Sequence, residues 1–314
     1  MNNLMSYTYS VARIRALETT LLSKQEVEKL LDSDNPDSII QTLENVNYGG
    51  TSGDKKNIEE FITKELDSAL KTVELLTPQK DRDIINLFRL RYDYHNLKVL
   101  TLAQLLRKKL SGTIPLGVYP LEELESSMPS ALMTEILSLK EDIKPEEITN
   151  TIEKQRWTHF LNVSKRNKFV LDLFRKNIDL INLKSFIQNK FLQVDKTGFE
   201  VQLIDNGRLD RSIFLDYYDQ PFETFFKYLS FTDYGIFKDV PVEDNLWSIE
   251  KIVDEYIGEY LSDRTKLVFF DIGPLINYIY LKEGEARTLR TVWVGKKNNL
   301  PKEKIKSYLR KSYV

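Results

Sequence analysis

A six-residue motif of the form acid-x-x-Asn/Thr-Leu-base occurs three times in this 314-residue chain and constrains its fold more than any other feature. The copies are Asp93 to Lys98 (DYHNLK), Asp179 to Lys184 (DLINLK) and, more loosely, Glu285 to Arg290 (EARTLR). They lie about 100 residues apart, well beyond the ~20 to 50 residues of solenoid repeats, so each copy has room for a small core of its own. The motif therefore predicts three related domains.

A longer internal match supports this repeat. The segment from Ser23 to Gly49 aligns with the segment from Leu209 to Gly235 at a constant offset, and the alignment places Tyr48 on Tyr234. Three copies of one helical unit, arranged around an axis, are the simplest explanation of both matches. The expected helical repeat domains are residues 1–110, 111–200 and 201–314.

Apolar residues recur at intervals of three and four along most of the chain, which places them on one helical face and predicts an all-α fold. Ser23 and Glu26 have the spacing of a capping box at a helix start. The best β-alternating run is Phe199 to Ile204, and breaks between helices are expected at Asp195 to Glu200 and at Tyr48 to Asp54. The predicted helices are Glu26 to Leu31, Ile39 to Leu43, Ile58 to Leu76, Ile84 to Lys109, Leu132 to Leu139, Phe160 to Phe191 and Ile249 to Leu261.

Within the motif, the leucine is the expected core residue and the charges have two interpretations. At 100° per residue, Asp93 and Lys98 stand about 140° apart on the helix, so they do not pair with each other. The charges either form ordinary interhelical ion pairs of small energetic weight, or the acids bind bases of the neighbouring domain and fix a three-fold arrangement. The candidate residues for these structural and interdomain contacts are Asp93, Asn96, Leu97, Lys98, Asp179, Asn182, Leu183, Lys184, Glu285, Leu289 and Arg290.

Charge balance and missing motifs argue against nucleic-acid binding and catalysis. The 45 Lys and Arg residues and 47 Asp and Glu residues give a formal net charge of −2, so no global field would hold the chain on nucleic acid. The chain has no cysteine, and its two histidines, His95 and His159, form no metal-binding pair. The G-x-G-x-x-G, P-loop and G-x-S-x-G patterns are absent. We therefore expect no enzymatic activity, no metal and no cofactor.

Two segments bear on location and partners. The most apolar stretch, Lys266 to Leu281, contains Asp271 and Pro274 and is shorter than the ~20 residues of a membrane-spanning helix. The N-terminus lacks the pattern of a secretory signal, so a cytoplasmic location is expected. The basic C-terminal segment, Lys296 to Val314, either complements the dipole of a last helix or forms a surface for an acidic partner or anionic head groups.

The order and spacing of these motifs resemble the V-type ATPase C/d subunits of bacteria and archaea over essentially the full length. The stretch Tyr9 to Glu18 (YSVARIRALE) is similar to the A-R-[IV]-R opening of that family. Asp93 to Lys98 and Asp179 to Lys184 match its D-x-x-N-L-K motif. Glu285 to Arg290, followed by Gly295-Lys296, is similar to its third copy, although threonine here replaces the usual asparagine.

The resemblance implies a funnel of three similar helical domains with approximate three-fold symmetry, peripheral on the inner face of the membrane. Such a non-catalytic coupling subunit would sit on the proteolipid rotor ring, hold the foot of the central stalk and transmit torque. It would be a monomer within the complex, and the membrane stator subunit is a further candidate partner. The alternatives are a free-standing helical scaffold for soluble partners and an enzyme with an unrecognised carboxylate site. The candidate partner contacts are Arg13, Arg15, Lys296, Lys297, Lys302, Lys304, Lys306, Arg310 and Lys311.

Overall fold

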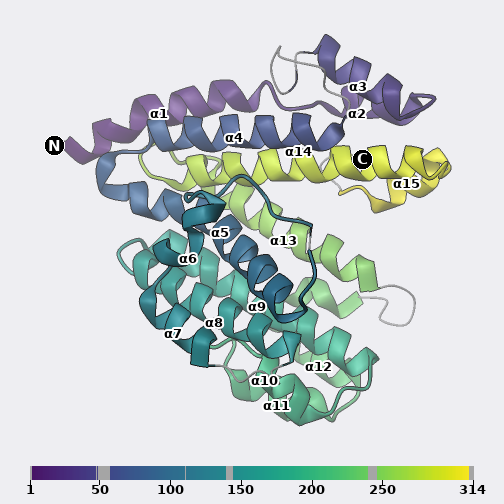
Figure 1. Ribbon diagram of the computed structural model, residues 1–314. Coiled ribbons are helices and arrows are strands. Elements are labelled where there is room, and N and C mark those ends of the chain that lie inside the picture. The colour runs from purple at the N-terminus through teal and green to yellow at the C-terminus, as the bar shows by residue number, and fades with distance from the viewer. Residues whose placement is uncertain are drawn as a thin grey trace. The chain divides into compact units, whose positions relative to one another are not determined.

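Every regular element of the described chain is a helix. The computed structural model describes residues 2–46, 48, 57–109, 111–138, 144–239 and 246–310, and no strand occurs among them (Figure 1). Because helices account for all the regular structure of these residues, the predicted all-α class is confirmed. None of the helices in this described part is long and apolar enough to cross a membrane. Apart from Tyr48, the predicted loop from Tyr48 to Asp54 lies outside the described residues.

Local capping starts several of the helices. The predicted capping box is present at α2 (Lys24–Asp32), where the Ser23 hydroxyl accepts the Glu26 N–H and the Glu26 carboxylate accepts the Ser23 N–H at 2.7 Å. Prolines occupy the first turns of α3 (Pro36–Asn45) and α8 (Pro145–Ser164), where the N–H that proline lacks would have no helical partner.

The chain divides into two compact units, residues 1–85 with 254–314 and residues 86–253. The two boundaries fall within the helices α5 (Arg82–Leu105) and α13 (Leu246–Thr265). This division differs from the three predicted domains, whose bounds stay a prediction.

The first unit is built around α14 (Gly273–Lys297). This helix packs along α4 (Ile58–Leu76) and α1 (Asn2–Glu18), and its sides also contact α3 and α15 (Lys302–Tyr308), which in turn packs on α2 (Figure 1). Because several neighbours surround α14, it buries residues on more than one face. A helix buried in this way shows no single apolar stripe, which is why the period-based prediction did not include it.

The second unit is centred on α9 (Lys168–Phe191). The helices α8, α10 (Lys196–Gln202) and α11 (Arg211–Tyr218) pack on α9, and α7 (Ser130–Ser138) packs on α8. The remaining elements are α6 (Leu124–Ser127), α12 (Phe222–Leu229) and the 3₁₀ turns η1 (Gln79–Asp81), η2 (Leu121–Glu123) and η3 (Gly235–Asp239).

An aromatic cluster around Phe186 forms the core of this second unit. The ring of Phe186 lies 5.7 Å from that of Phe199, 5.6 Å from that of Tyr218 and 4.3 Å from that of Phe225, measured between centroids. These rings come from α10, α11 and α12. Phe186 therefore joins all three short helices to α9.

The predicted break at Asp195 to Glu200 and the β-like run at Phe199 to Ile204 are both wrong, because α10 occupies this segment. Asp195 caps the helix by accepting the Gly198 N–H at 2.6 Å. Phe199 and Leu203 are buried, whereas Val201 is 48% exposed. Burial at an interval of four, and not of two, identifies the pattern as helical.

The predicted helix from Phe160 to Phe191 is two helices. α8 ends at Ser164 and α9 begins at Lys168. Asn167 caps α9, since its side-chain oxygen accepts the Val170 N–H at 3.1 Å. The apolar spacing continues across the break, so the periodicity alone could not reveal it.

Replacing Phe186 by Ala should lower the free energy of unfolding by about 3 to 5 kcal/mol, because it leaves a cavity among three helices. Urea unfolding followed by circular dichroism measures the change. Phe231→Ala is the matched control: Phe231 is 82% exposed, and its loss should change stability by less than about 0.5 kcal/mol. Equal effects of the two substitutions would contradict this account of the core.

Candidate functional site

Each copy of the repeated motif lies within a long helix, α5, α9 or α14, and begins with a fully buried acid. Asp93, Asp179 and Glu285 are each 0% exposed, as are the motif leucines that accompany them, Leu97, Leu183 and Leu289. A buried carboxylate needs hydrogen-bond donors to offset its lost hydration. We call the place where a motif binds the backbone of another segment a repeat junction.

At the α5 junction, two motif side chains hold one loop. Asp93 accepts the N–H groups of Val118 at 2.7 Å and of Tyr119 at 3.3 Å. Asn96, one turn further along α5, donates to the Ile114 carbonyl at 2.9 Å and accepts the Ile114 N–H at 2.7 Å. The loop is therefore fixed at two points by backbone contacts that do not depend on its side chains.

The α9 junction repeats this arrangement. Asp179 accepts the Arg208 N–H at 2.9 Å and the Leu209 N–H at 3.1 Å. Asn182 donates to the Ile204 carbonyl at 2.8 Å and accepts the Ile204 N–H at 3.0 Å. The two D-x-x-N motifs therefore make the same pair of contacts, acid to N–H groups and amide to one peptide unit.

The α14 junction keeps the acid but loses the amide. Glu285 accepts the Leu22 N–H at 2.7 Å and the Lys282 ammonium at 2.9 Å. Lys282 also reaches Glu65 of α4 at 2.7 Å. Thr288, in place of asparagine, lacks an amide that could both donate to and accept from one peptide unit. An ion-paired cluster therefore accompanies the loop contact here.

The residues bound at the α9 and α14 junctions correspond in the long internal match. Leu22 directly precedes Ser23 and Arg208 directly precedes Leu209, so the N–H groups that reach Glu285 and Asp179 come from aligned positions. Both positions stand just before a helical hairpin, α2–α3 or α11–α12. The junctions therefore position equivalent hairpins.

The aligned tyrosines also lie at these junctions. The Tyr234 hydroxyl donates to Asp179, and the ammonium of Lys176, three residues before that acid, lies 5.6 Å from the Tyr234 ring centroid. Lys282 stands at the same place before Glu285 and lies 5.6 Å from the Tyr48 ring. The alignment of Tyr48 with Tyr234 thus coincides with a shared cation–π contact.

Two glycines allow the loops to come this close. A Cβ atom at Gly117 would lie 2.1 Å from Oδ1 of Asp93, and one at Gly207 would lie 2.0 Å from Oδ1 of Asp179. Any other residue would push the loop off the acid. The sequence prediction included neither glycine among the site residues, although a glycine near a buried motif is the available indication of a close backbone approach.

Asp93 and Asp179 both accept backbone N–H groups, and the hypothesis that the acids also bind bases of a neighbouring domain stays a prediction. It is the motif bases that form interhelical ion pairs. The motif helices follow one another along the chain in the order α5, α9 and α14. The bases of α5 and α9 each pair with the helix that directly precedes the next motif helix, and the base of α14 pairs with α4, which precedes α5. The pairs are Lys98 with Glu153 of α8 at 3.2 Å, Lys184 with Glu250 of α13 at 2.5 Å and Arg290 with Glu59 of α4 at 2.8 Å.

Burial dominates the titration of the junction acids. It raises the pKa of Asp179 to about 6, although the Tyr234 hydroxyl and the loop N–H groups favour the charged form. Burial also raises the pKa of Asp93 against its loop contacts, and that of Glu285 against the attraction of Lys282. These carboxyl groups therefore hold a proton more tightly in the folded chain than in the unfolded chain.

Much of the basic C-terminal segment is matched by carboxylates of the same unit. Lys302 and Lys306 both bind Glu28 of α2, at 2.9 and 2.7 Å. Arg310 binds Asp254 at 2.5 Å. Among the remaining partner-contact candidates, Arg15 pairs with Glu18 at 2.8 Å and donates to the Thr265 carbonyl at 2.6 Å. The side chains of Arg13, Lys297 and Lys304 are exposed, and that of Lys296 is half-buried. Lys311 lies outside the described residues.

Among the residues that the structure describes, no group of three or more His, Asp or Glu side chains is placed to hold a metal ion. The fold and its junctions thus describe a helical protein whose buried polar groups bind its own backbone. At the repeat junctions these groups hold loops against the long helices α5, α9 and α14.

The family model of the ATP synthase (C/AC39) subunit matches residues 10–308. The C subunit of the V-type sodium ATPase of Enterococcus hirae is 26% identical, over 96% of this chain and 97% of that protein. The C subunits of the A-type ATP synthases of Thermococcus kodakarensis and Methanocaldococcus jannaschii are each 24% identical, over 96% and 98% of this chain and 90% and 87% of those proteins.

The chain belongs to the ATP synthase (C/AC39) subunit family, and the resemblance stated from its motifs is confirmed. It is a subunit of the V- and A-type ATPases. Its family membership also confirms the prediction of a structural subunit that is not an enzyme.

Gly207→Ala should lower the free energy of unfolding by about 1 to 3 kcal/mol, because the added methyl group overlaps the Asp179 carboxylate. Gly284→Ala in α14 is the control. No atom lies within 4 Å of a Cβ placed there, so alanine should be neutral or stabilising by up to about 1 kcal/mol. Urea denaturation measures both, and a Gly207→Ala variant as stable as wild type would contradict the close approach.

The Asp179 carboxyl should make the folded chain more stable relative to the unfolded chain as the pH falls. Its folded-state pKa of about 6 lies above the ordinary value of 3.8, so the native state binds the proton first and stability rises as the pH falls from about 7 to about 4. The full difference corresponds to about 3 kcal/mol.

The measurement is the free energy of unfolding of wild type minus that of Asp179→Asn, taken at several pH values. This difference should increase toward acid pH, because the amide does not titrate. A difference that decreases as the pH falls would show that the folded state favours the charged carboxylate.

Proposed function

We propose that this chain is the coupling subunit of a rotary V/A-type ATPase, peripheral on the inner face of the membrane. It sits on the proteolipid rotor ring, holds the foot of the central stalk and transmits torque between ATP hydrolysis or synthesis and ion transport. Family membership and full-length similarity to the C subunits of V- and A-type ATPases support this function over that of a free-standing scaffold.

For the architecture, we propose three similar helical domains around an approximate three-fold axis, forming a funnel. The observation that carries this proposal is the set of repeat junctions together with the motif bases. Lys98, Lys184 and Arg290 pair with α8, α13 and α4. Arg290 of α14, in the third repeat, pairs with α4, which belongs to the first repeat. Each repeat is thus linked to the next and the third is linked to the first, as a ring of three repeats requires.

Such a structure suits a subunit that transmits torque and catalyses no reaction. A joint between a ring and a stalk must transmit force through many contacts spread over a wide radius, and polar contacts at a rim are suited to reversible association. Arg13, Lys297 and Lys304 are exposed, and the described part of the chain supplies no carboxylate within ion-pair distance of them. These three bases are therefore the strongest candidates for such contacts.

The purified chain should bind the isolated stalk complex and the detergent-solubilised rotor ring separately, and should have no ATPase activity of its own. Binding should weaken severalfold as the ionic strength rises above about 0.15 M, because salt screens exposed charges. Surface plasmon resonance with each partner measures both effects. Failure to bind either partner at low salt would contradict the coupling function.

Charge reversal tests the contact residues. The triple variant Arg13→Glu, Lys297→Glu and Lys304→Glu should bind at least one partner about tenfold more weakly. The matched control replaces three other exposed lysines, Lys144, Lys165 and Lys227, by Glu, so the two triple variants have the same net charge. Equal losses in the two variants would assign the effect to net charge and remove Arg13, Lys297 and Lys304 from the interface.

A further inference from the structure

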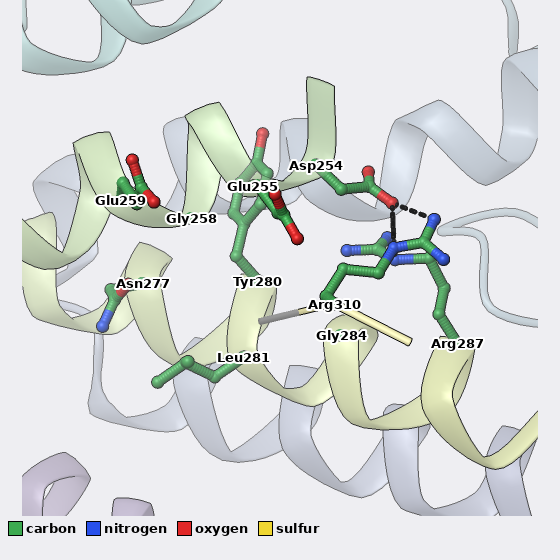
Figure 2. A pocket seen from close by; sticks show the side chains of 10 residues that line it. All are labelled: Asp254, Glu255, Gly258, Glu259, Asn277, Tyr280, Leu281, Gly284, Arg287 and Arg310. Carbon is green, nitrogen blue, oxygen red and sulfur yellow. Dashed lines mark hydrogen bonds and ion pairs between the residues drawn. The ribbon is translucent and has the colours of Figure 1, made fainter. Parts of the chain in front are cut away.

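A groove of about 330 Å³ runs between α13 and α14 within the first unit (Figure 2). The two helices are antiparallel, joined by the residues between Thr265 and Gly273. Gly258 of α13 and Gly284 of α14 lie along its middle, with Tyr280 and Leu281 beside them. None of these four residues belongs to a repeat motif or to a predicted partner contact, whereas one end of the groove is lined by Arg287 of the third motif copy and by Arg310, a predicted partner contact.

The two ends of the groove differ in charge. At one end Asp254 binds Arg310 at 2.5 Å and Arg287 at 3.3 Å, so two guanidinium groups share one carboxylate and leave an excess of positive charge (Figure 2). At the other end the exposed Glu259 lies near Asn277. Glu255 lines the groove between the two ends.

The packing of the protein does not require the two glycines. A Cβ atom at Gly258 or Gly284 would have no atom within 4 Å, and neither residue has the positive φ that favours glycine. Glycine inside a helix costs roughly 0.5 to 1 kcal/mol relative to alanine. Both helices thus accept this cost at positions along the groove where larger residues would fill it.

We propose that this groove binds a helix of a partner protein. The apolar side chains of that helix enter between Gly258 and Gly284, a basic residue faces Glu259 and an acidic residue faces Arg287. Groove shape, apolar middle and opposite charges at the two ends together define this occupant, which corresponds to helix-in-groove recognition.

The spacing of the charges sets the pattern of the bound helix. Asp254 and Glu259 are five residues apart on α13, about 7.5 Å along its axis. Two turns of a partner helix, from position i to i+7, span about 10.5 Å on one face, with i+3 and i+4 between them. This is about 3 Å more than the spacing on α13, a difference that the flexible acidic and basic side chains at the two ends of the partner helix can bridge. The expected partner therefore carries opposite charges at i and i+7 and apolar residues at i+3 and i+4.

A simple anion does not fit this site as well. Asp254 already accepts hydrogen bonds from Arg310 and forms an ion pair with Arg287 at 3.3 Å, so an added anion would compete with a carboxylate held by the protein itself. It would also leave the apolar middle and Glu259 uncovered. A partner helix covers all three parts of the groove.

The probe is a fluorescein-labelled, alanine-based helical peptide of about 20 residues with Glu, Leu, Leu and Lys at i, i+3, i+4 and i+7. Fluorescence anisotropy with the isolated full chain measures its affinity. Wild type should bind the peptide saturably. Gly284→Leu, which fills the groove, should weaken binding about tenfold or more, whereas Gly284→Ala should retain it.

Charge exchange provides the second test. Glu259→Lys should weaken binding of this peptide about tenfold, and a peptide with Glu in place of its Lys should recover affinity for that variant. Glu303→Lys on α15 is the matched control, since Glu303 is exposed and outside the groove. Circular dichroism should show that every variant keeps its helical content.

Peptide binding that ignores Gly284→Leu, or no saturable binding by wild type, would overturn the proposal. Self-association of the chain that Gly284→Leu abolishes would assign the groove to a second copy and would also overturn it. The readout uses neither rotor ring nor stalk, so these outcomes are separate from those that test the coupling function.

Discussion

The buried motif acid is the interaction on which each repeat depends. Asp93 and Asp179 are enclosed in the protein and accept backbone N–H groups. A charge removed from water is tolerated only where several donors replace its hydration. If a loop moved away from its acid, the buried carboxylate would therefore lose the N–H donors that replace its hydration. Because the loop bound by Asp179 leads directly into α11, the same contact also decides where the following hairpin starts.

The third copy shows what happens when one member of the set changes. Thr288 lacks the amide that holds a peptide unit in the other copies, and the acid beside it is Glu285, which reaches Lys282 as well as a loop N–H. Lys282 then bridges to Glu65 on α4. This junction holds its helices by ion pairs where the others hold loops by amide contacts, so the three copies are related without being identical.

Sequence reasoning found the elements whose causes are local. The capping box at Ser23 and the burial of Leu97 follow from spacing alone. The repeat can be recognised because its residues recur with the same spacing in each copy. The partners of the acids were not predictable in this way, because a backbone N–H has no side chain that a pattern could reveal. Nor could spacing identify Glu59 as the partner of Arg290, since 231 residues separate them. The division into two compact units likewise depends on contacts between distant segments.

A hydrophobic contact in place of each acid could supply similar stability, since buried polar groups are often matched in energy by well-packed apolar ones. What it could not supply is direction. Asn182 accepts from and donates to the same peptide unit, at 3.0 and 2.8 Å, so the Ile204 peptide can neither rotate nor slide without losing both bonds. Apolar surfaces allow small sliding displacements at little cost, because the hydrophobic effect is not directional. For a subunit proposed to carry torque, the amide and the acid therefore resist the displacement that matters, rotation of one segment against the helix that holds it.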